Sequence, residues 1–278
     1  MILVKTPEEI HIMQEGGRKL GVILSNLLSM SGAGVSLETI EQSAQKLIYK
    51  EGGTPSFQTV EGYRYATCLC VNEEVVHAPP RPLVLKEGDI LTIDIGMLYQ
   101  GFHTDTAWAK IITSHNSYLP ASPESNRGEP AGKASLITHN SQEKLNFLKT
   151  GELTLKKAIE IARPGNRVGN ISEIIEKNIT EKGYSVVRAL TGHGVGKNLH
   201  EEPMIPEYLE GPVEKTPLLT VGMTLAIEVI YAIGNGIIEY ANNDGWTLAS
   251  KDRSLTAVFE HTIALLEEKT IVLTGRSL

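Results

Sequence analysis

The chain carries two copies of one residue pattern, and this repeat constrains its fold more than any other feature. The segment 85–95 matches the segment 219–229 in its glycine, its apolar positions and one acid, at an offset of 134 residues. Upstream, the positions 34, 37, 40 and 52 match 165, 168, 171 and 183 in the same way, at an offset of 131. Two matched blocks at nearly one offset predict a duplicated helix–helix–strand unit. Chance similarity between amphipathic segments is the alternative.

Caps and hydrophobic periodicity place helices and strands along both halves. Thr6 followed by Pro7 begins the first helix, and Ser36 caps a second helix over 37–50. Further helices are expected at 142–162 and 171–182. Strands are expected at 68–76, 90–112, 185–190, 223–233, 236–241 and 257–266, and a turn centred on Tyr99 and Gln100 makes 90–112 a hairpin.

A polar segment, 113–141, lies between the two halves. It is rich in Ser, Pro, Gly and Asn, a composition typical of loops. We expect a tolerated surface insertion, either a partner-binding loop or a segment without a role. The 278 residues are therefore expected to form a single domain, 1–278, made of half-repeats at about 1–112 and 142–278.

Composition excludes several classes of protein. A net charge of -7 argues against binding to a nucleic-acid backbone, which requires a concentrated basic surface. The apolar run 1–4 is too short for a signal peptide, and no run of 18 apolar residues predicts a membrane helix. Cys68 and Cys70 stand two apart, too close on a strand to bridge easily, so we expect reduced thiols and a cytoplasmic protein.

Acids inside apolar strands are the first functional signal. Asp94 and Glu228 occupy the same slot in the two halves, and Glu260 lies in a third apolar strand. Buried carboxylates need a partner charge or a metal. The expected hairpin register places Asp105 directly opposite Asp94, about 4.5–5.5 Å away between Cβ atoms. A divalent cation between the two would relieve their repulsion.

Histidines complete the candidate site. His193 stands among three glycines, where the backbone can approach closely, whereas the spacing of a phosphate-binding loop is absent. Four carboxylates and one imidazole suit two divalent ions, such as Mn, Fe, Co or Zn. His77 and His200 lie at strand or loop ends and are candidates for proton and oxyanion work, although each could be an ordinary surface histidine. His261, next to Glu260, must point to the opposite face and is interpreted as structural.

Five ordered blocks of residues resemble the type I methionine aminopeptidases. The blocks are 70–80, 94–107, 192–203, 226–231 and 244–262, and the likeness covers the chain except residues 113–141. The resemblance implies the α+β pita-bread fold, in which two pseudo-symmetric αβ halves surround a curved antiparallel sheet. It also implies removal of the initiator methionine from nascent chains, by attack of a dimetal-bound hydroxide on the first peptide bond.

The resemblance further implies a role for each site residue. The residue matching Asp94 binds one metal, those matching His193 and Glu228 bind the other, and those matching Asp105 and Glu260 bridge both. Glu228 would also shuttle the proton, His200 would steady the oxyanion, and His77 would contact the amide nitrogen after the scissile bond. The methionine pocket would be formed by Phe57, Tyr63, Cys68, Leu199 and Trp246, of which Phe57 could equally be ordinary core.

Three departures from the family pattern, Ala78, Leu199 and Val229, put pocket shape and rate in doubt but leave the metal ligands intact. An Xaa-Pro peptidase and a non-catalytic protein on the same scaffold are the alternatives. The expected partners are N-terminal methionine peptides, with no nucleic acid and no membrane. We expect a monomer, and a contact with the ribosome is left open.

Overall fold

The computed structural model describes residues 2–114 and 139–275. Within them, the helices are α1 (Pro7–Met30), α2 (Leu37–Lys50), α3 (His139–Ile161) and α4 (Val168–Thr180), with short 3-10 turns at Ser56–Thr59 and Val213–Lys215. The strands are β1 (Thr54–Pro55), β2 (Thr67–Val71), β3 (Glu74–Val76), β4 (Ile90–Tyr99), β5 (Phe102–Ile111), β6 (Ser185–Val186), β7 (Thr191–Gly194), β8 (Glu201–Pro206), β9 (Thr224–Ala232), β10 (Ile238–Tyr240), β11 (Leu248–Ser250), β12 (Thr256–Leu265) and β13 (Thr270–Val272).

Local chemistry sets the starts of α1 and α2 as the sequence predicts. The Thr6 hydroxyl accepts the Glu9 N–H, the Glu9 carboxylate accepts the Thr6 N–H, and Pro7 opens α1. Ser36 caps α2 through the Thr39 N–H. The helices α3 and α4 each begin three residues earlier than expected. The expected strand 68–76 is divided by a turn at residues 72 and 73, and only residues 185 and 186 of the expected strand 185–190 are extended.

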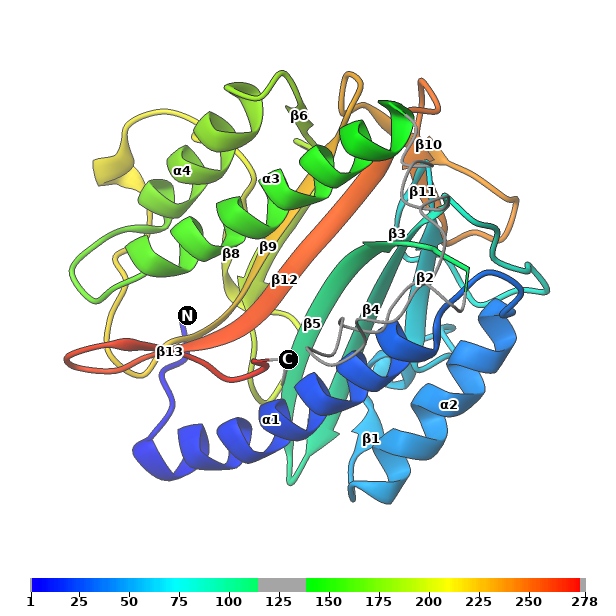
Figure 1. The fold of residues 1–278 in the computed structure, drawn as a ribbon. Coiled ribbons are helices and arrows are strands. Elements are labelled where there is room, and N and C mark those ends of the chain that lie inside the picture. Colours follow the sequence, from blue (N-terminus) through cyan, green and yellow to red (C-terminus); the bar gives the residue numbers. More distant parts are fainter. Residues whose placement is uncertain (1, 115–138, 276–278) are drawn as a thin grey trace, which may run out of the picture.

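Each half is built around one long strand, and all strand pairs are antiparallel. In the first half, β4 pairs with β5, β2 and β1. In the second half, β9 pairs with β12, β7 and β6, so each of these four strands of the first half has a counterpart in the second. The strands β5 and β12, from the two halves, lie side by side at the centre (Figure 1).

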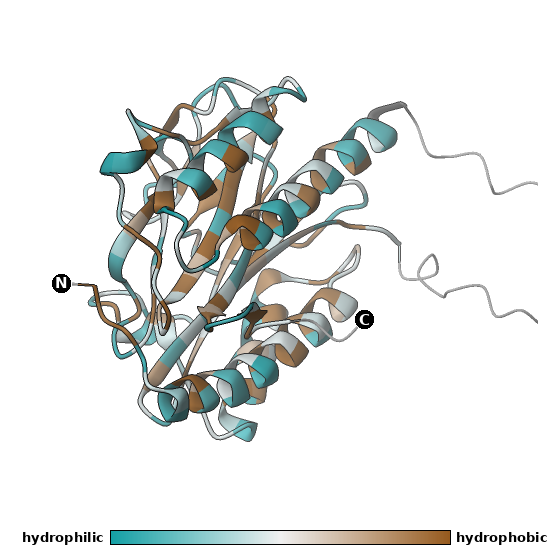
Figure 2. Ribbon diagram, turned by 90° about the vertical axis from the view of Figure 1, so that its left-hand side faces the viewer, coloured by the Kyte–Doolittle hydropathy of each residue, from teal (hydrophilic) through white to brown (hydrophobic). Residues whose placement is uncertain are grey.

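Helices cover one side of each half-sheet (Figure 1). The apolar residues of α1 and α2 form one core with those of β2 and β4, and those of α3 and α4 form a second core with β9 and β12. Hydrophobic and hydrophilic stretches alternate along the helices (Figure 2), as expected of helices with one buried side. The other side of the central strands is therefore left for the site.

The two halves turn at equivalent glycines. Gly34 and Gly165 have φ of 91° and 92°, and Gly88 and Gly222 have φ of 88° and 87°. These left-handed values favour glycine, because a Cβ would strain the backbone. An isolated bridge joins Ser36 to Val84 in one half and Arg167 to Leu218 in the other. The α+β fold with two pseudo-symmetric halves is confirmed.

The expected register of the β4–β5 hairpin is wrong by two residues. The turn is centred on Gln100 and Gly101, both with positive φ, rather than on Tyr99 and Gln100. Asp94 therefore pairs with Ala107, and Asp105 pairs with Gly96. Because a shift of two keeps side chains on the same face, both acids still point to the same side of the sheet.

Two threonines join the halves where β5 meets β12. The Thr106 hydroxyl donates to the Glu260 carbonyl oxygen at 2.8 Å. The Thr262 hydroxyl accepts the Asp105 N–H at 2.9 Å and donates to the Asp105 carbonyl oxygen at 2.8 Å. These bonds fix the backbones that carry Asp105 and Glu260 relative to each other.

Most of the expected insertion, residues 115–138, lies outside the described residues. Among the helices that the structure does describe, none combines the length and the apolar character needed to cross a bilayer. Both cysteines are buried and free.

Candidate active site

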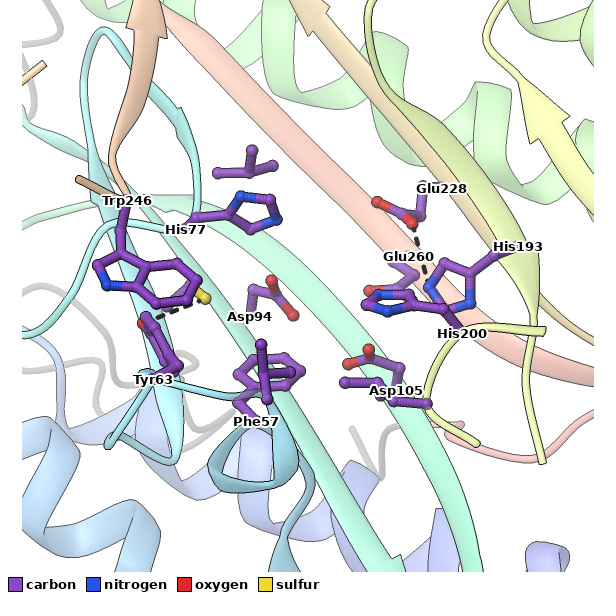
Figure 3. Close-up of a pocket in the computed structure, with 14 residues that line it drawn as sticks. Phe57, Tyr63, His77, Asp94, Asp105, His193, His200, Glu228, Trp246 and Glu260 are labelled. Atoms are coloured by element: carbon purple, nitrogen blue, oxygen red, sulfur yellow. Dashed lines mark hydrogen bonds and ion pairs between the residues drawn. The ribbon is translucent and has the colours of Figure 1, made fainter. Parts of the chain in front are cut away.

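One pocket gathers the site residues that the sequence predicts (Figure 3). It lies on the side of the central strands that the helices leave free. Figure 3 shows three acids and two imidazoles at one end, Trp246 and Tyr63 at the other, and Asp94 and His77 between them. The predicted residues that line it are Phe57, Tyr63, Cys68, His77, Asp94, Asp105, His193, Leu199, His200, Glu228, Trp246 and Glu260. Val60 and Val76 also line it, and nothing in the local sequence pattern distinguishes them.

Each of the four central strands contributes one acid. Asp94 comes from β4, Asp105 from β5, Glu228 from β9 and Glu260 from β12. Glu228 and Glu260 are directly opposed across the β9–β12 ladder, the arrangement that the sequence suggested for the two aspartates. Directly opposed like charges destabilise a sheet unless a proton or a cation intervenes.

Burial makes this cluster of acids hard to ionise together. It raises the pKa of Asp105 to about 7. Burial, followed by the charges of Asp105 and Glu228, raises the pKa of Asp94 well above its usual range. The pKa values of Glu228 and Glu260 are also raised, first by burial; for Glu228 the next causes are Glu207 and Asp105, and for Glu260 they are Asp105, Glu228 and Asp94. A protein without cations would have to keep part of the cluster protonated.

His193 presents one ring nitrogen to the acids. Its Nδ1 lies 2.8 Å from the Gly194 carbonyl oxygen, so Nδ1 carries the proton and Nε2 is free to bind a cation. Nε2 lies 3.6 Å from Glu228 Oε1. Burial, and then His200, lowers the pKa of His193 to about 4, so the ring is neutral near pH 7.

This donor set fits divalent cations. One potential ligand atom from each of Asp105, His193 and Glu260 lies within 4.8 Å of the others. Asp94 Oδ1 and Glu260 Oε1 are buried and accept no hydrogen bond from the residues that the structure describes. Buried carboxylate oxygens without partners are costly unless they coordinate a metal. Carboxylate oxygens and a neutral imidazole are ligands that Mn, Fe, Co and Zn accept.

An apolar subsite adjoins the acids. Phe57, Tyr63, Cys68 and Leu199 are buried against one another, with Trp246 packed on them. The Tyr63 and Trp246 rings meet edge to face, with centroids 5.0 Å apart. The Tyr63 hydroxyl donates to the Thr67 carbonyl oxygen at 2.8 Å, which satisfies the only polar group of that side chain. The subsite therefore presents carbon and sulfur to whatever enters it.

His77 and His200 stand at the rim of the pocket, both exposed. His77 has φ of 61°, a left-handed backbone that is uncommon for a residue with a Cβ and is often found at functional sites. The His200 ring lies 4.4 Å from the His193 ring, centroid to centroid. Partial burial lowers the pKa of both rim histidines, which favours neutral imidazoles.

Two features near the pocket were missed by the sequence reasoning. The carboxylate of Glu207, which is fully buried, accepts the Ile230 N–H at 3.0 Å. Among the neighbouring charges, that of Glu207 raises the pKa of Glu228 the most. Thr106 and Thr262 join the halves, and their proximity to predicted ligands in the sequence was the available signal. As expected, His261 does not line the pocket; its Nδ1 lies 3.0 Å from Thr274 Oγ1.

Comparisons with known proteins agree with this geometry. Residues 11–267 match the model of metallopeptidase family M24. The chain is 39% identical over 274 residues to methionine aminopeptidase 1 of Bacillus subtilis, covering 99% of both chains. The crystal structure of methionine aminopeptidase from Thermotoga maritima is 34% identical and superposes with a TM-score of 0.86, covering 99% of this chain and 100% of that one.

A more distant structure shows the fold alone. The prolidase from Pyrococcus horikoshii is 19% identical, with a TM-score of 0.72 over 100% of this chain and 65% of that one. The pocket geometry and the full-length matches lead to one conclusion: this chain belongs to metallopeptidase family M24 and, within it, to the methionine aminopeptidases.

Proposed function

We propose that this chain hydrolyses the first peptide bond of nascent proteins and so removes the initiator methionine. One observation carries the proposal: a cluster of buried acids and a neutral imidazole adjoins an apolar aromatic subsite within a single pocket. The close relatives named methionine aminopeptidase support the same reaction.

Family M24 consists of metallopeptidases, and divalent cations are their cofactors. We infer two ions here, of Co, Mn, Fe or Zn. Asp94, Asp105, His193, Glu228 and Glu260 would hold them, with Asp105 and Glu260 shared between the two. When bound, such ions supply Lewis acidity toward water and toward the scissile carbonyl.

The protein's own residues would move protons and stabilise charge. The Glu228 carboxylate, whose pKa burial raises, can hold a proton taken from the attacking water. His200, at the rim, would donate a hydrogen bond to the oxygen on which negative charge develops. His77 would contact the amide nitrogen after the scissile bond.

The apolar subsite would select the methionine side chain. A flexible thioether packs well against aromatic edges and a thiol, as presented by Phe57, Tyr63, Cys68 and Trp246. Leu199 closes the subsite where relatives often carry an aromatic residue. We expect this replacement to alter the fit, and hence KM, more than the chemical step.

The organisation of the chain is also a proposal. Residues 1–278 would form a single catalytic domain of half-repeats at about 1–112 and 142–278, with a polar insertion at 113–141. We propose a monomeric cytoplasmic enzyme that meets its substrates as they are made, with or without a contact to the ribosome.

A peptide assay tests the proposed reaction. The purified protein is stripped with a chelator, reloaded with Mn²⁺ or Co²⁺, and given Met-Ala-Ser beside Ala-Pro-Ser. We expect release of methionine from the first peptide, loss of activity on chelation and recovery on reloading. The variant Asp105→Asn should fold and lose activity, whereas Glu87→Gln, at an exposed acid away from the pocket, should keep it.

The assay also separates the alternatives. Cleavage of the proline peptide alone would replace the proposal with an Xaa-Pro peptidase. Cleavage of neither peptide, together with no binding of metal, would indicate a non-catalytic protein on the same scaffold.

A further inference from the structure

The segment 195–200 connects β7 to β8 and carries two of the pocket residues. It forms no regular helix or strand, yet it holds Leu199 in the apolar subsite and His200 at the rim. A bent segment of this kind does not fix a side chain by backbone ladder bonds alone. The contacts beneath it therefore decide where the His200 imidazole lies.

A buried ion pair lies beneath this segment. The Lys5 ammonium donates to Glu201 Oε2 at 2.5 Å, and the two side chains are only 4% and 3% exposed. Glu201 directly follows His200, and its other oxygen, Oε1, accepts the Asn198 N–H at 3.1 Å. The Glu201 carboxylate thus connects Lys5, in the N-terminal segment, to the backbone of Asn198, two residues before His200.

Gly196 packs directly against this pair. A Cβ added to Gly196 would lie 2.3 Å from Lys5 Cε and 2.9 Å from Glu201 Oε1. The Lys5 N–H donates to the Gly222 carbonyl oxygen at 2.7 Å, which anchors the N-terminal segment to the second half before α1 begins. From the first half, the His103 N–H donates to the Gly196 carbonyl oxygen at 2.7 Å. Gly196 is therefore held on both sides.

Stability alone is a poor explanation for such a pair. Desolvating two charges costs about as much as their attraction returns, so a buried ion pair is weak evidence for stability. Its geometry, by contrast, is specific: the Glu201 carboxylate that pairs with the Lys5 ammonium also accepts the Asn198 N–H, so the pair is tied to the backbone of the segment 195–200. The segment also has an ion pair nearer the surface, between the exposed Lys197 and the half-buried Glu9 at 3.3 Å, which lacks this constraint.

We propose that Lys5 and Glu201 are positioning residues that act through His200. Their buried ion pair fixes the segment 195–200 so that the His200 imidazole faces the substrate carbonyl. The N-terminal segment thereby becomes a working part of the active site. The inference rests on the proposed peptidase activity and extends it to two residues outside the pocket lining.

A double-mutant cycle tests the proposal. Lys5→Met alone would leave the buried Glu201 carboxylate without its partner and lower stability strongly. The test therefore uses the double variant Lys5→Met with Glu201→Gln, which removes both charges of the ion pair. The variants are the pair, His200→Ala, and the combination of all three, each loaded with Mn²⁺ and assayed on Met-Ala-Ser. Circular dichroism and Tm confirm that each one is folded.

We expect the pair to lower kcat/KM by about tenfold or more, because small misplacements of catalytic groups are costly. In the His200→Ala background the same pair should cause little further loss, since its effect passes through the missing imidazole. Lys197→Met, in the same segment, should leave kcat and KM unchanged. Ile48→Val, in the core under the first half, should lower Tm and spare kcat/KM.

Three results would overturn the inference. Unchanged kinetics in the folded pair variant would show that the ion pair does not position His200. An equal loss in both backgrounds would show that it acts independently of His200. If the unmodified protein does not cleave the methionine peptide, the proposed function fails first, and the positioning role falls with it.

Discussion

Removal of the metal should make the stability of this protein fall as the pH rises, with Asp105 as one identifiable cause. Asp105 is 4% exposed and sits among three other acids. In the metal-free protein, burial raises its pKa from 3.8 to about 7. The folded chain then holds a proton at Asp105 through a pH range in which the unfolded chain has released it.

The sign and size follow from linkage. Between pH 3.8 and 7 the folded state binds more protons at Asp105 than the unfolded state does, so the free energy of unfolding decreases as pH rises. The shift from 3.8 to about 7 is roughly 3 units, and at about 1.36 kcal/mol per unit it corresponds to roughly 4 kcal/mol. The loss is complete above pH 7 and absent below pH 3.8.

Other groups also titrate, so a comparison of variants is needed. The pKa of His193 is lowered to about 4, so its contribution to stability is lost as pH falls from 6.5 toward 4, which opposes the trend of Asp105. Asp105→Asn removes the Asp105 contribution, and because the Asp105 charge also raises the pKa values of Asp94, Glu228 and Glu260, it weakens their contributions in the same direction. The variant should therefore gain stability relative to the unmodified protein, by roughly 4 kcal/mol or more, as the pH rises from 4 to 8.

Urea unfolding followed by circular dichroism in the presence of a chelator, at pH 4, 5, 6, 7 and 8, measures this difference. Glu87→Gln, at an exposed acid, is the control and should track the unmodified protein at every pH. A difference between Asp105→Asn and the unmodified protein that stays constant with pH, or that changes in the opposite direction, would refute the reasoning. Saturating Mn²⁺ should reverse the order, because the unmodified protein alone keeps its full ligand set.

Three further predictions concern the contact between β5 and β12, the apolar subsite and the turn at Gly165. Thr262→Val removes both hydrogen bonds to the Asp105 backbone, so the free energy of unfolding in urea should fall by about 1–3 kcal/mol and Mn²⁺ binding in calorimetry should weaken. Unchanged metal affinity would contradict a role for the contact between β5 and β12 in aligning the ligands. Trp246→Ala opens the subsite beside Tyr63 and should raise KM for Met-Ala-Ser more than it lowers kcat, and a pure kcat effect would argue against side-chain binding there. Gly165→Ala places a Cβ at φ 92° with open space around it, so backbone strain alone should lower the free energy of unfolding by about 1 kcal/mol, seen as a lower Tm, with kcat/KM retained. A loss of activity in the folded variant would mean that this turn also affects the active site.

Much of the fold could be read from local patterns. The caps at Thr6 and Ser36 predicted where α1 and α2 begin, because the hydrogen bonds of a cap lie within three residues of one another. The repeated pattern predicted two equivalent halves, and the structure shows that its matched glycines have matching left-handed φ values, which restrict the choice of residue at a single position. The acids within apolar strands marked the pocket, because buried charge is too costly to occur without a reason.

The hairpin between β4 and β5 shows where local patterns become insufficient. Gln-Gly and Tyr-Gln both suit a turn, and moving the turn by one residue moves the pairing of the strands by two. Alternation of side chains is unchanged by such a shift, so the sequence could not distinguish opposite from diagonal placement of Asp94 and Asp105. The observed pairing of β4 with β5 places Asp94 and Asp105 diagonally, and it is Glu228 and Glu260 that lie directly opposite each other, across β9 and β12.

By itself, the sequence determined the duplication, the starts of α1 and α2 and the kinds of ligand available, because a repeated pattern, a helix cap and an acid in an apolar strand can each be recognised from residue types and their spacing. Only the tertiary structure decided which groups meet: Thr262 with the Asp105 backbone, and Lys5 with Glu201 beneath His200. These partners are 157 and 196 residues apart, and no periodicity or motif extends that far. Their contact is set by how two half-sheets and an N-terminal segment pack together, and packing depends on the shape of the whole core.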